Sequence, residues 1–177
     1  MRAKAMVLFG GAILACMVAT AAPPEGAASQ ARTTPAFDRF KALAGEWVAA
    51  DDGDMVKKGD LVARYHVTAG GTAVVEELFP GTPNEMTTVY HLDGQDLLLT
   101  HYCMMGNQPQ MRAKPTASSR VAFDFDGGKN IDPKRDPHMH GASFEFVSAN
   151  EVRTEWTHYN DGKPAGTASF HLVRRSS

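Results

Sequence analysis

From Gly45 to the end of the chain, apolar and polar residues alternate with a period of two in short runs. Turn-forming residues such as Gly70-Gly71, Asp93-Gly94 and Asn160-Asp161-Gly162 separate these runs. Alternation bounded by such turns is typical of short antiparallel strands. The pattern predicts about ten strands, near residues 45–50, 60–68, 72–79, 86–92, 96–104, 108–114, 120–126, 139–147, 151–158 and 165–174.

One short helix is predicted ahead of the strands. Residues Ala36 to Leu43 carry apolar side chains at helical spacing, and Thr34 stands before Pro35 as a candidate N-cap. Sequential strands with a single helix indicate an all-β fold, an antiparallel up-and-down β-barrel of about ten strands with a short N-terminal helix. Closure removes the exposed sheet edges. A barrel of this strand number is wide enough to enclose a cavity.

The first residues have the pattern of an export signal. Arg2 and Lys4 precede an uncharged apolar run, and Ala19-Thr20-Ala21 offers small residues for cleavage. We therefore predict a signal peptide over residues 1–21, a flexible tether over 22–35, a barrel domain over 36–177, and a periplasmic or secreted location. The apolar run is short for a membrane span, which needs roughly 20 residues. Lipoprotein cleavage before Cys16, with a lipid anchor, and an uncleaved core helix are the alternatives.

The composition is that of an ordinary globular domain. Apolar residues make up 43% and charged residues 21% of the chain, and the formal net charge is −2. These values exclude a mainly disordered chain and give no basic excess for binding nucleic acid. Cleavage after Ala21 would leave Cys103 as the one cysteine, so no disulfide could form within the mature chain.

Residues Gly45-Glu46-Trp47 at the first predicted strand resemble the Gly-x-Trp opening of lipocalins and their calycin relatives. The resemblance implies that the Trp closes one end of the barrel and that a basic residue near the last strand, Arg174 or Arg175, packs on it. Longer segments, among them Thr100-His101-Tyr102-Cys103 and Phe125-Asp126-Gly127-Gly128, resemble uncharacterised secreted bacterial proteins with a lipocalin-like domain. That resemblance implies a fold and no particular activity.

The strand pattern predicts which side chains face the cavity. A two-residue turn at Asp93-Gly94 would pair Tyr90 with Leu97 and Thr88 with Leu99. Aromatic side chains with a few polar groups suit a small, partly apolar ligand, which is the predicted partner. The candidate ligand-binding residues are Thr88, Tyr90, His101, Cys103, Phe123, Phe125, His140, Phe144, Trp156 and His158.

A metal or haem site is the alternative prediction, with catalytic activity as an added possibility. Its ligands would be His101, Cys103, His140 and His158, because imidazole and thiolate bind zinc, iron and copper well. One carboxylate could come from Glu76 or Glu77, of which only one can point inward. Haem barrels of the nitrobindin type are more distant relatives by resemblance.

Two further function classes have less support in the sequence. It contains no Gly-x-Ser-x-Gly, phosphate-binding glycine loop or His-Glu-x-x-His motif, so no catalytic residue is predicted. An interaction module of the cell envelope is the third class, and it predicts a large exposed apolar patch.

Overall fold

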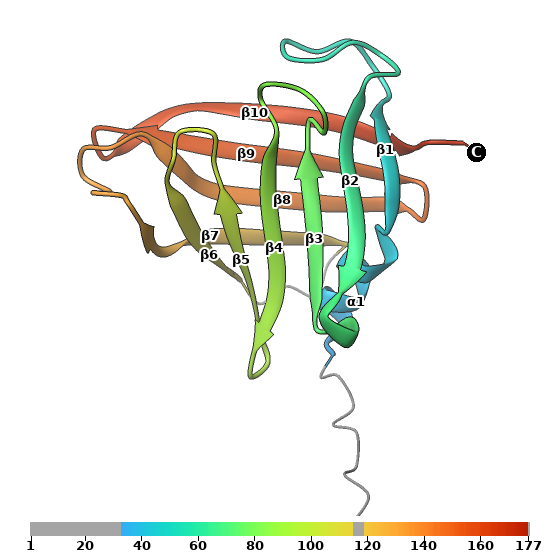
Figure 1. Ribbon diagram of the computed structural model, residues 1–177, viewed down its shortest axis with the longest axis horizontal. Coiled ribbons are helices and arrows are strands. Elements are labelled where there is room, and N and C mark those ends of the chain that lie inside the picture. The colour runs from blue at the N-terminus through green and yellow to red at the C-terminus, as the bar shows by residue number, and fades with distance from the viewer. Residues whose placement is uncertain (1–32, 115–118, 177) are drawn as a thin grey trace, which may run out of the picture. The chain divides into compact units, whose positions relative to one another are not determined.

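The computed structural model describes residues 33–114 and 119–176. Within them each strand pairs antiparallel with the next, and β1 meets β10 to close a ten-stranded barrel (Figure 1). The elements are α1 (Pro35–Ala42), β1 (Gly45–Ala49), β2 (Leu61–Thr68), the short 3-10 turn η1 (Ala69–Gly71), β3 (Ala73–Leu78), β4 (Met86–Asp93), β5 (Asp96–Tyr102), β6 (Gln108–Ala113), β7 (Arg120–Lys129), β8 (His138–Ser148), β9 (Glu151–Asn160) and β10 (Lys163–Arg174).

The predicted fold class is confirmed. The structure has an all-β antiparallel barrel with one short α-helix ahead of it, and the strands lie close to their predicted positions. Thr34 caps the helix, since its side chain accepts a hydrogen bond from the backbone N–H of Phe37 at 3.2 Å. Pro35 takes the first helical position, where its missing N–H costs nothing.

The register predicted for the β4–β5 hairpin is wrong by two residues. Thr88 pairs with His101 and Tyr90 with Leu99, because Asp93 stays in the strand opposite Asp96. The turn is formed by Gly94 and Gln95, and Gly94 has a φ of 62°. Glycine at the first position of a two-residue turn favours this left-handed conformation. Because side chains alternate with a period of two, a shift of two residues keeps every side chain on its predicted face.

The alternation of faces predicted for the later strands is also observed. In β9, Val152, Thr154 and Trp156 are buried, while Arg153 and Glu155 between them are exposed. Phe123 in β7 and Phe144 in β8 are buried in the same way. One face of the sheet therefore points into the barrel and the other to solvent.

Trp47 closes the barrel at the end that carries α1. Its indole N–H donates to the carbonyl of Leu43 at 2.7 Å, and the guanidinium carbon of Arg174 lies 4.5 Å from the ring centre. Arg174 also donates to the carbonyls of Ala42 and Ala44, at 2.8 and 2.7 Å, where the helix ends. A cation there satisfies free carbonyl groups and suits the helix dipole. The basic residue that the resemblance implied is thus Arg174.

Gly45 makes room for this contact. Its φ is +127°, and a Cβ added there would lie 2.9 Å from the Nη1 atom of Arg174. A larger residue would be strained in this conformation and would push the guanidinium away.

Part of the predicted domain organisation lies outside the described residues. This applies to the signal peptide, residues 1–21, with the alternative cleavage before Cys16, and to residues 22–32 of the tether. Among residues 33–114 and 119–176, no helix has the length and apolar character needed to cross a membrane.

Replacing Arg174 with Met should lower the free energy of unfolding by about 2–3 kcal/mol, because the change removes a cation–π contact and hydrogen bonds to the carbonyls at the helix end. Urea denaturation followed by circular dichroism measures this loss. Arg175→Met is the matched control: Arg175 forms an exposed ion pair with Glu46, and its removal should cost about 0–1 kcal/mol. Equal losses for the two variants would contradict the role given to Arg174.

Candidate functional site

Phe40 of α1 fills the barrel interior next to the closed end. It is fully buried, and its ring centre lies 4.4 Å from that of Tyr90, 5.0 Å from Phe144 and 5.7 Å from Phe123. The sequence predicted these three aromatic residues as cavity lining and did not predict that a helix side chain packs against all of them. At this end they form a core with α1.

A buried carboxyl group, Glu76, lies further along the interior and is surrounded by hydroxyl groups. The Tyr65 hydroxyl donates to its Oε1 atom at 2.5 Å, and the Tyr90 hydroxyl donates to Oε2 at 2.6 Å. The Thr88 hydroxyl lies near enough to lower the pKa of this carboxyl group. The next residue, Glu77, instead pairs with Arg64 at 2.9 Å. Glu76 is therefore the inward member of the two glutamates.

The pKa values of this group reflect its burial. Burial raises the pKa of Glu76 above its ordinary value of 4.5, and the hydrogen bonds from Tyr65 and Tyr90, together with the nearby Thr88 hydroxyl, oppose the rise. Burial and the nearby Glu76 charge raise the pKa of both tyrosines well above 10. Both phenols therefore keep their protons and remain hydrogen-bond donors to the carboxyl group.

His101 extends this network toward the middle of the barrel. Its Nδ1 atom lies 2.9 Å from the Thr88 hydroxyl oxygen, and the residue is 1% exposed. Burial lowers the pKa of His101 to about 4, so the ring is neutral at pH 7. The Trp156 ring lies beside it, with 5.1 Å between the ring centres.

The network ends in polar atoms that have no hydrogen-bond partner. Within the described part of the chain, three buried side-chain atoms are in this state: His101 Nε2, Asn107 Oδ1 and Trp156 Nε1. The His101 and Trp156 atoms belong to rings that contact each other. Such atoms are few in native proteins, and each costs about 1–3 kcal/mol.

A cleft of about 530 Å³ is lined in part by residues 53–56 of the loop between β1 and β2. This loop lies at the end of the barrel opposite α1 (Figure 1). Trp156 is not among the lining residues, but it pairs with one of them, Ala168 on β10, and lies two residues before another, His158, on the same face of β9. The cleft is lined by Gly53, Asp54, Met55, Val56, Met139, His158, Gly166, Thr167, Ala168, Ser169 and Phe170.

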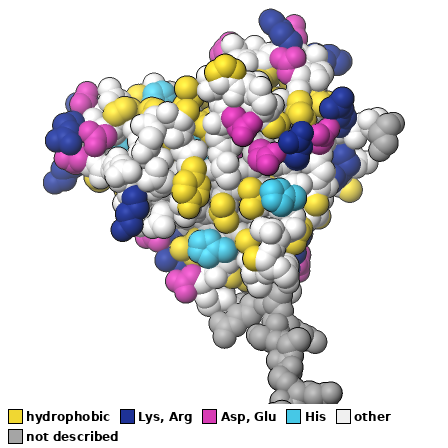
Figure 2. All heavy atoms as spheres, in the orientation of Figure 1, with side chains coloured by type: hydrophobic (Ala, Val, Ile, Leu, Met, Phe, Trp, Pro, Cys, Tyr) yellow, Lys and Arg dark blue, Asp and Glu magenta, His cyan; other side chains and the backbone are white. Residues whose placement is uncertain are grey.

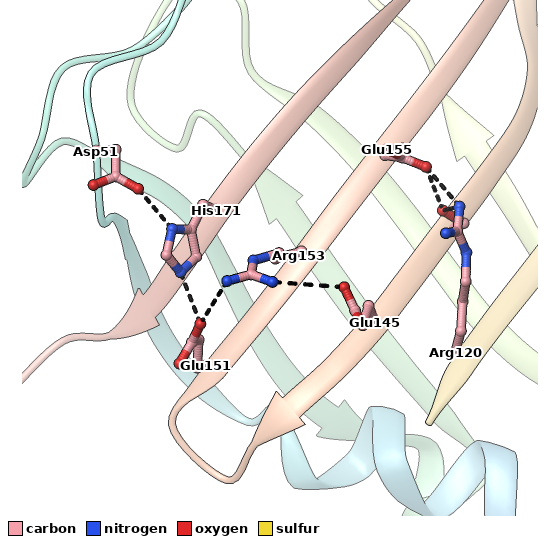
Figure 3. Close-up of polar contacts among 8 residues, drawn as sticks. Asp51, Arg120, Glu145, Glu151, Arg153, Glu155 and His171 are labelled. Carbon is pink, nitrogen blue, oxygen red and sulfur yellow. Dashed lines mark hydrogen bonds and ion pairs between the residues drawn. The ribbon is translucent and has the colours of Figure 1, made fainter. Parts of the chain in front are cut away.

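An ion-pair network on the outer face fixes the β1–β2 loop (Figure 3). His171 Nδ1 lies 2.6 Å from an Asp51 carboxylate oxygen, and Nε2 lies 2.9 Å from one of Glu151. Both ring nitrogens can donate only when the ring is protonated. Arg153 holds Glu151 from the other side at 3.3 Å. The loop that forms one wall of the cleft is therefore tied to β10 and β9.

The remaining predicted site residues lie in three different settings. His158 lines the cleft, whereas Cys103 is buried with its sulfur 4.0 Å from that of Met86. Burial raises the pKa of the Cys103 thiol. His140 stacks between Tyr159, at 3.7 Å, and Phe125, at 4.9 Å.

The local backbone and a second histidine decide the setting of His140. Strand β8 has a bulge there, because Met139 pairs with His158 and Gly141 with Thr157. His138 lies next to it, with its Nε2 atom 3.0 Å from the His140 Nδ1 atom. Burial and the neighbouring His138 lower the pKa of His140.

Among the described residues, no group of three or more His, Cys, Asp or Glu side chains is placed to hold a metal ion. His101, Cys103, His140 and His158 are the predicted ligands, and the metal or haem alternative stays a prediction. On the face shown in Figure 2, hydrophobic side chains lie in small groups among polar and charged ones.

No family model matches this sequence, and no curated protein matches it either.

Stability should depend on pH through His101. Its pKa is lowered from 6.5 to about 4 by folding, so its stabilising contribution is complete above pH 6.5 and is lost as the pH falls toward 4. Relative to His101→Gln, the parent's free energy of unfolding should drop by about 3 kcal/mol between pH 7 and pH 4. Urea titrations at both pH values measure the difference. His66→Gln, which removes an exposed histidine of β2, is the control variant. If His101→Gln loses as much unfolding free energy as the parent between pH 7 and pH 4, the role assigned to His101 is contradicted.

Asp51→Asn should loosen the loop over the cleft, because it removes the carboxylate that His171 holds. Trypsin should then cut more rapidly after Lys57 and Lys58, which lie in this loop, as measured by mass spectrometry of timed digests at neutral pH. Asp54→Asn in the same loop is the matched control. Equal cleavage rates for the two variants would show that the Asp51–His171 pair does not restrain the loop.

Proposed function

We propose that this domain binds small, partly apolar molecules in the cleft at the open end of the barrel. The observation that carries the proposal is the cleft itself, whose volume of about 530 Å³ lies within the usual range for ligand sites, roughly 300–1,000 Å³. Its lining combines Met139, Val56 and Phe170 with the imidazole of His158. Such a surface suits a molecule with an apolar body and a few polar groups.

The difference between the two barrel ends supports the same proposal. The end with Trp47 is filled by Phe40 and sealed by Arg174. A ligand would therefore enter from the opposite end, where the β1–β2 loop borders the cleft. The resemblance to lipocalins, which rests on Gly45-Glu46-Trp47, agrees with a barrel that is closed at one end and open to ligands at the other.

We further propose that the protein acts outside the cytoplasm, in the periplasm or as a secreted protein. The basic, apolar and small-residue order of residues 1–21 supports this location. The ligand would then be a molecule of the cell envelope or its surroundings.

A neutral fluorescent probe, N-phenyl-1-naphthylamine, tests the binding proposal. We expect its emission to rise on titration with the parent protein and its affinity to fall at least about tenfold in Ala168→Phe, because the added ring occupies the cleft. Circular dichroism would check that the variant folds.

The matched control is Ala122→Phe, which adds the same ring to the outer face of β7, between the buried residues Val121 and Phe123. This variant should bind the probe as the parent does. If the parent does not bind the probe, or both variants bind as well as the parent, the cleft is not the binding site.

A further inference from the structure

The two unpartnered nitrogens of His101 and Trp156 offer different hydrogen-bonding chemistry. The indole N–H of Trp156 is a donor only, whereas a neutral imidazole has one donor and one acceptor nitrogen. Which His101 nitrogen carries the proton is decided by its neighbour Thr88, whose hydroxyl oxygen lies 2.9 Å from Nδ1.

The proton of the Thr88 hydroxyl and that of His101 are coupled through their contact. Glu76 is buried and takes hydrogen bonds from the hydroxyl groups of Tyr65 and Tyr90, and Thr88 lies near enough to lower the pKa of this carboxyl group. An acceptor on that side suits a Thr88 hydroxyl whose proton faces Glu76 and whose oxygen accepts from His101 Nδ1. In that tautomer Nε2 presents a bare lone pair.

Among the described residues, His101 and Trp156 therefore bring together an unused acceptor, Nε2, and an unused donor, Nε1, on rings whose centres are 5.1 Å apart. Both residues are more than nine-tenths buried. Trp156 adjoins the cleft through Ala168, its partner on β10, and through His158 on the same face of β9. To place its head group beside these two rings, a ligand in the cleft has to extend inward past Ala168 and His158.

We propose that His101 and Trp156 form a head-group subsite for neutral ligands that both donate and accept a hydrogen bond, such as long-chain alcohols. The ligand's O–H donates to His101 Nε2, its oxygen accepts from the Trp156 N–H, and its alkyl chain lies along Met139 and Phe170. The subsite rests on the proposed binding function and adds the chemical class of the ligand. An anionic head group is disfavoured, because it brings no proton for Nε2 and would lie near the buried carboxyl group of Glu76.

Two isomeric probes separate the head group from the apolar chain. 1-Decanol and 1-methoxynonane contain the same atoms, and only the alcohol can donate a hydrogen bond. In displacement of N-phenyl-1-naphthylamine from the parent protein, we expect 1-decanol to bind about tenfold more tightly, the value of one hydrogen bond to a buried acceptor. His101→Phe should abolish this preference, and His101→Gln, which restores an acceptor oxygen, should recover part of it.

Nuclear magnetic resonance of the parent protein tests the same contacts without any variant. The Trp156 indole N–H signal should move when 1-decanol is added, while the Trp47 signal, already bonded to the Leu43 carbonyl at 2.7 Å, should stay in place. The ring ¹⁵N shifts of His101 should show the proton on Nδ1. These spectra keep the test decisive even if His101→Phe does not fold.

The outcomes distinguish the subsite from the proposed function. If both isomers displace the probe equally and the Trp156 signal does not move, the subsite is wrong and the cleft still binds apolar molecules. A proton on Nε2 of His101 would also overturn the subsite. If neither isomer nor the probe binds the parent protein, the proposed function fails as well.

Discussion

The contact between Arg174 and the end of α1 decides where that helix lies, and the barrel interior depends on the position of the helix. Arg174 covers Trp47 and holds the carbonyls of Ala42 and Ala44. With the helix end fixed, Phe40 enters the barrel and stacks on Tyr90, whose hydroxyl holds Glu76. A surface arginine is thus connected to the buried polar network through three successive contacts, and only the opposite end of the barrel stays open.

The buried polar network is satisfied at one end and unsatisfied at the other. Glu76 takes two hydrogen bonds, from the hydroxyl groups of Tyr65 and Tyr90, which offset part of the cost of burying a carboxyl group. His101 Nε2 and Trp156 Nε1 lack partners among the described residues. In a barrel built only for stability, apolar side chains at these two positions would avoid that cost. The unsatisfied end lies on the side of the cleft, where a polar ligand could supply what the protein does not.

Local patterns were sufficient to predict the fold and the inward faces. Alternation of apolar and polar residues located ten strands, and an even error of two residues in the β4–β5 register left Thr88, Tyr90 and His101 facing inward. Strand alternation could also say that only one of Glu76 and Glu77 points inward. It could not say which one, because that depends on the register against β2 and β4.

Features that depend on non-local packing were not predictable in this way. Phe40 occupies the barrel because α1 packs against its end, and Arg174, near the other end of the chain, donates to the carbonyl of Ala42 where α1 ends. The bulge in β8, between Met139 and Gly141, changes the neighbours of His140, and the alternation of residues along this segment did not predict it. The unpartnered nitrogens of His101 and Trp156 result from side-chain packing in the folded interior, and no sequence motif predicts them.

The seam between β1 and β10 also bears on how the chain reaches this structure. Strand β1 pairs with β10 over three residues only, and the Arg174–Ala44 contact joins positions 130 residues apart. A contact of such high sequence separation forms late and slowly, since loop closure must precede any gain from pairing. Because β1 is synthesised before β10, the edge of β1 that pairs with β10 stays unpaired until the last strand has been made. Until then the nascent barrel is an open sheet, and the interval before closure is when it is most exposed to pairing with another chain.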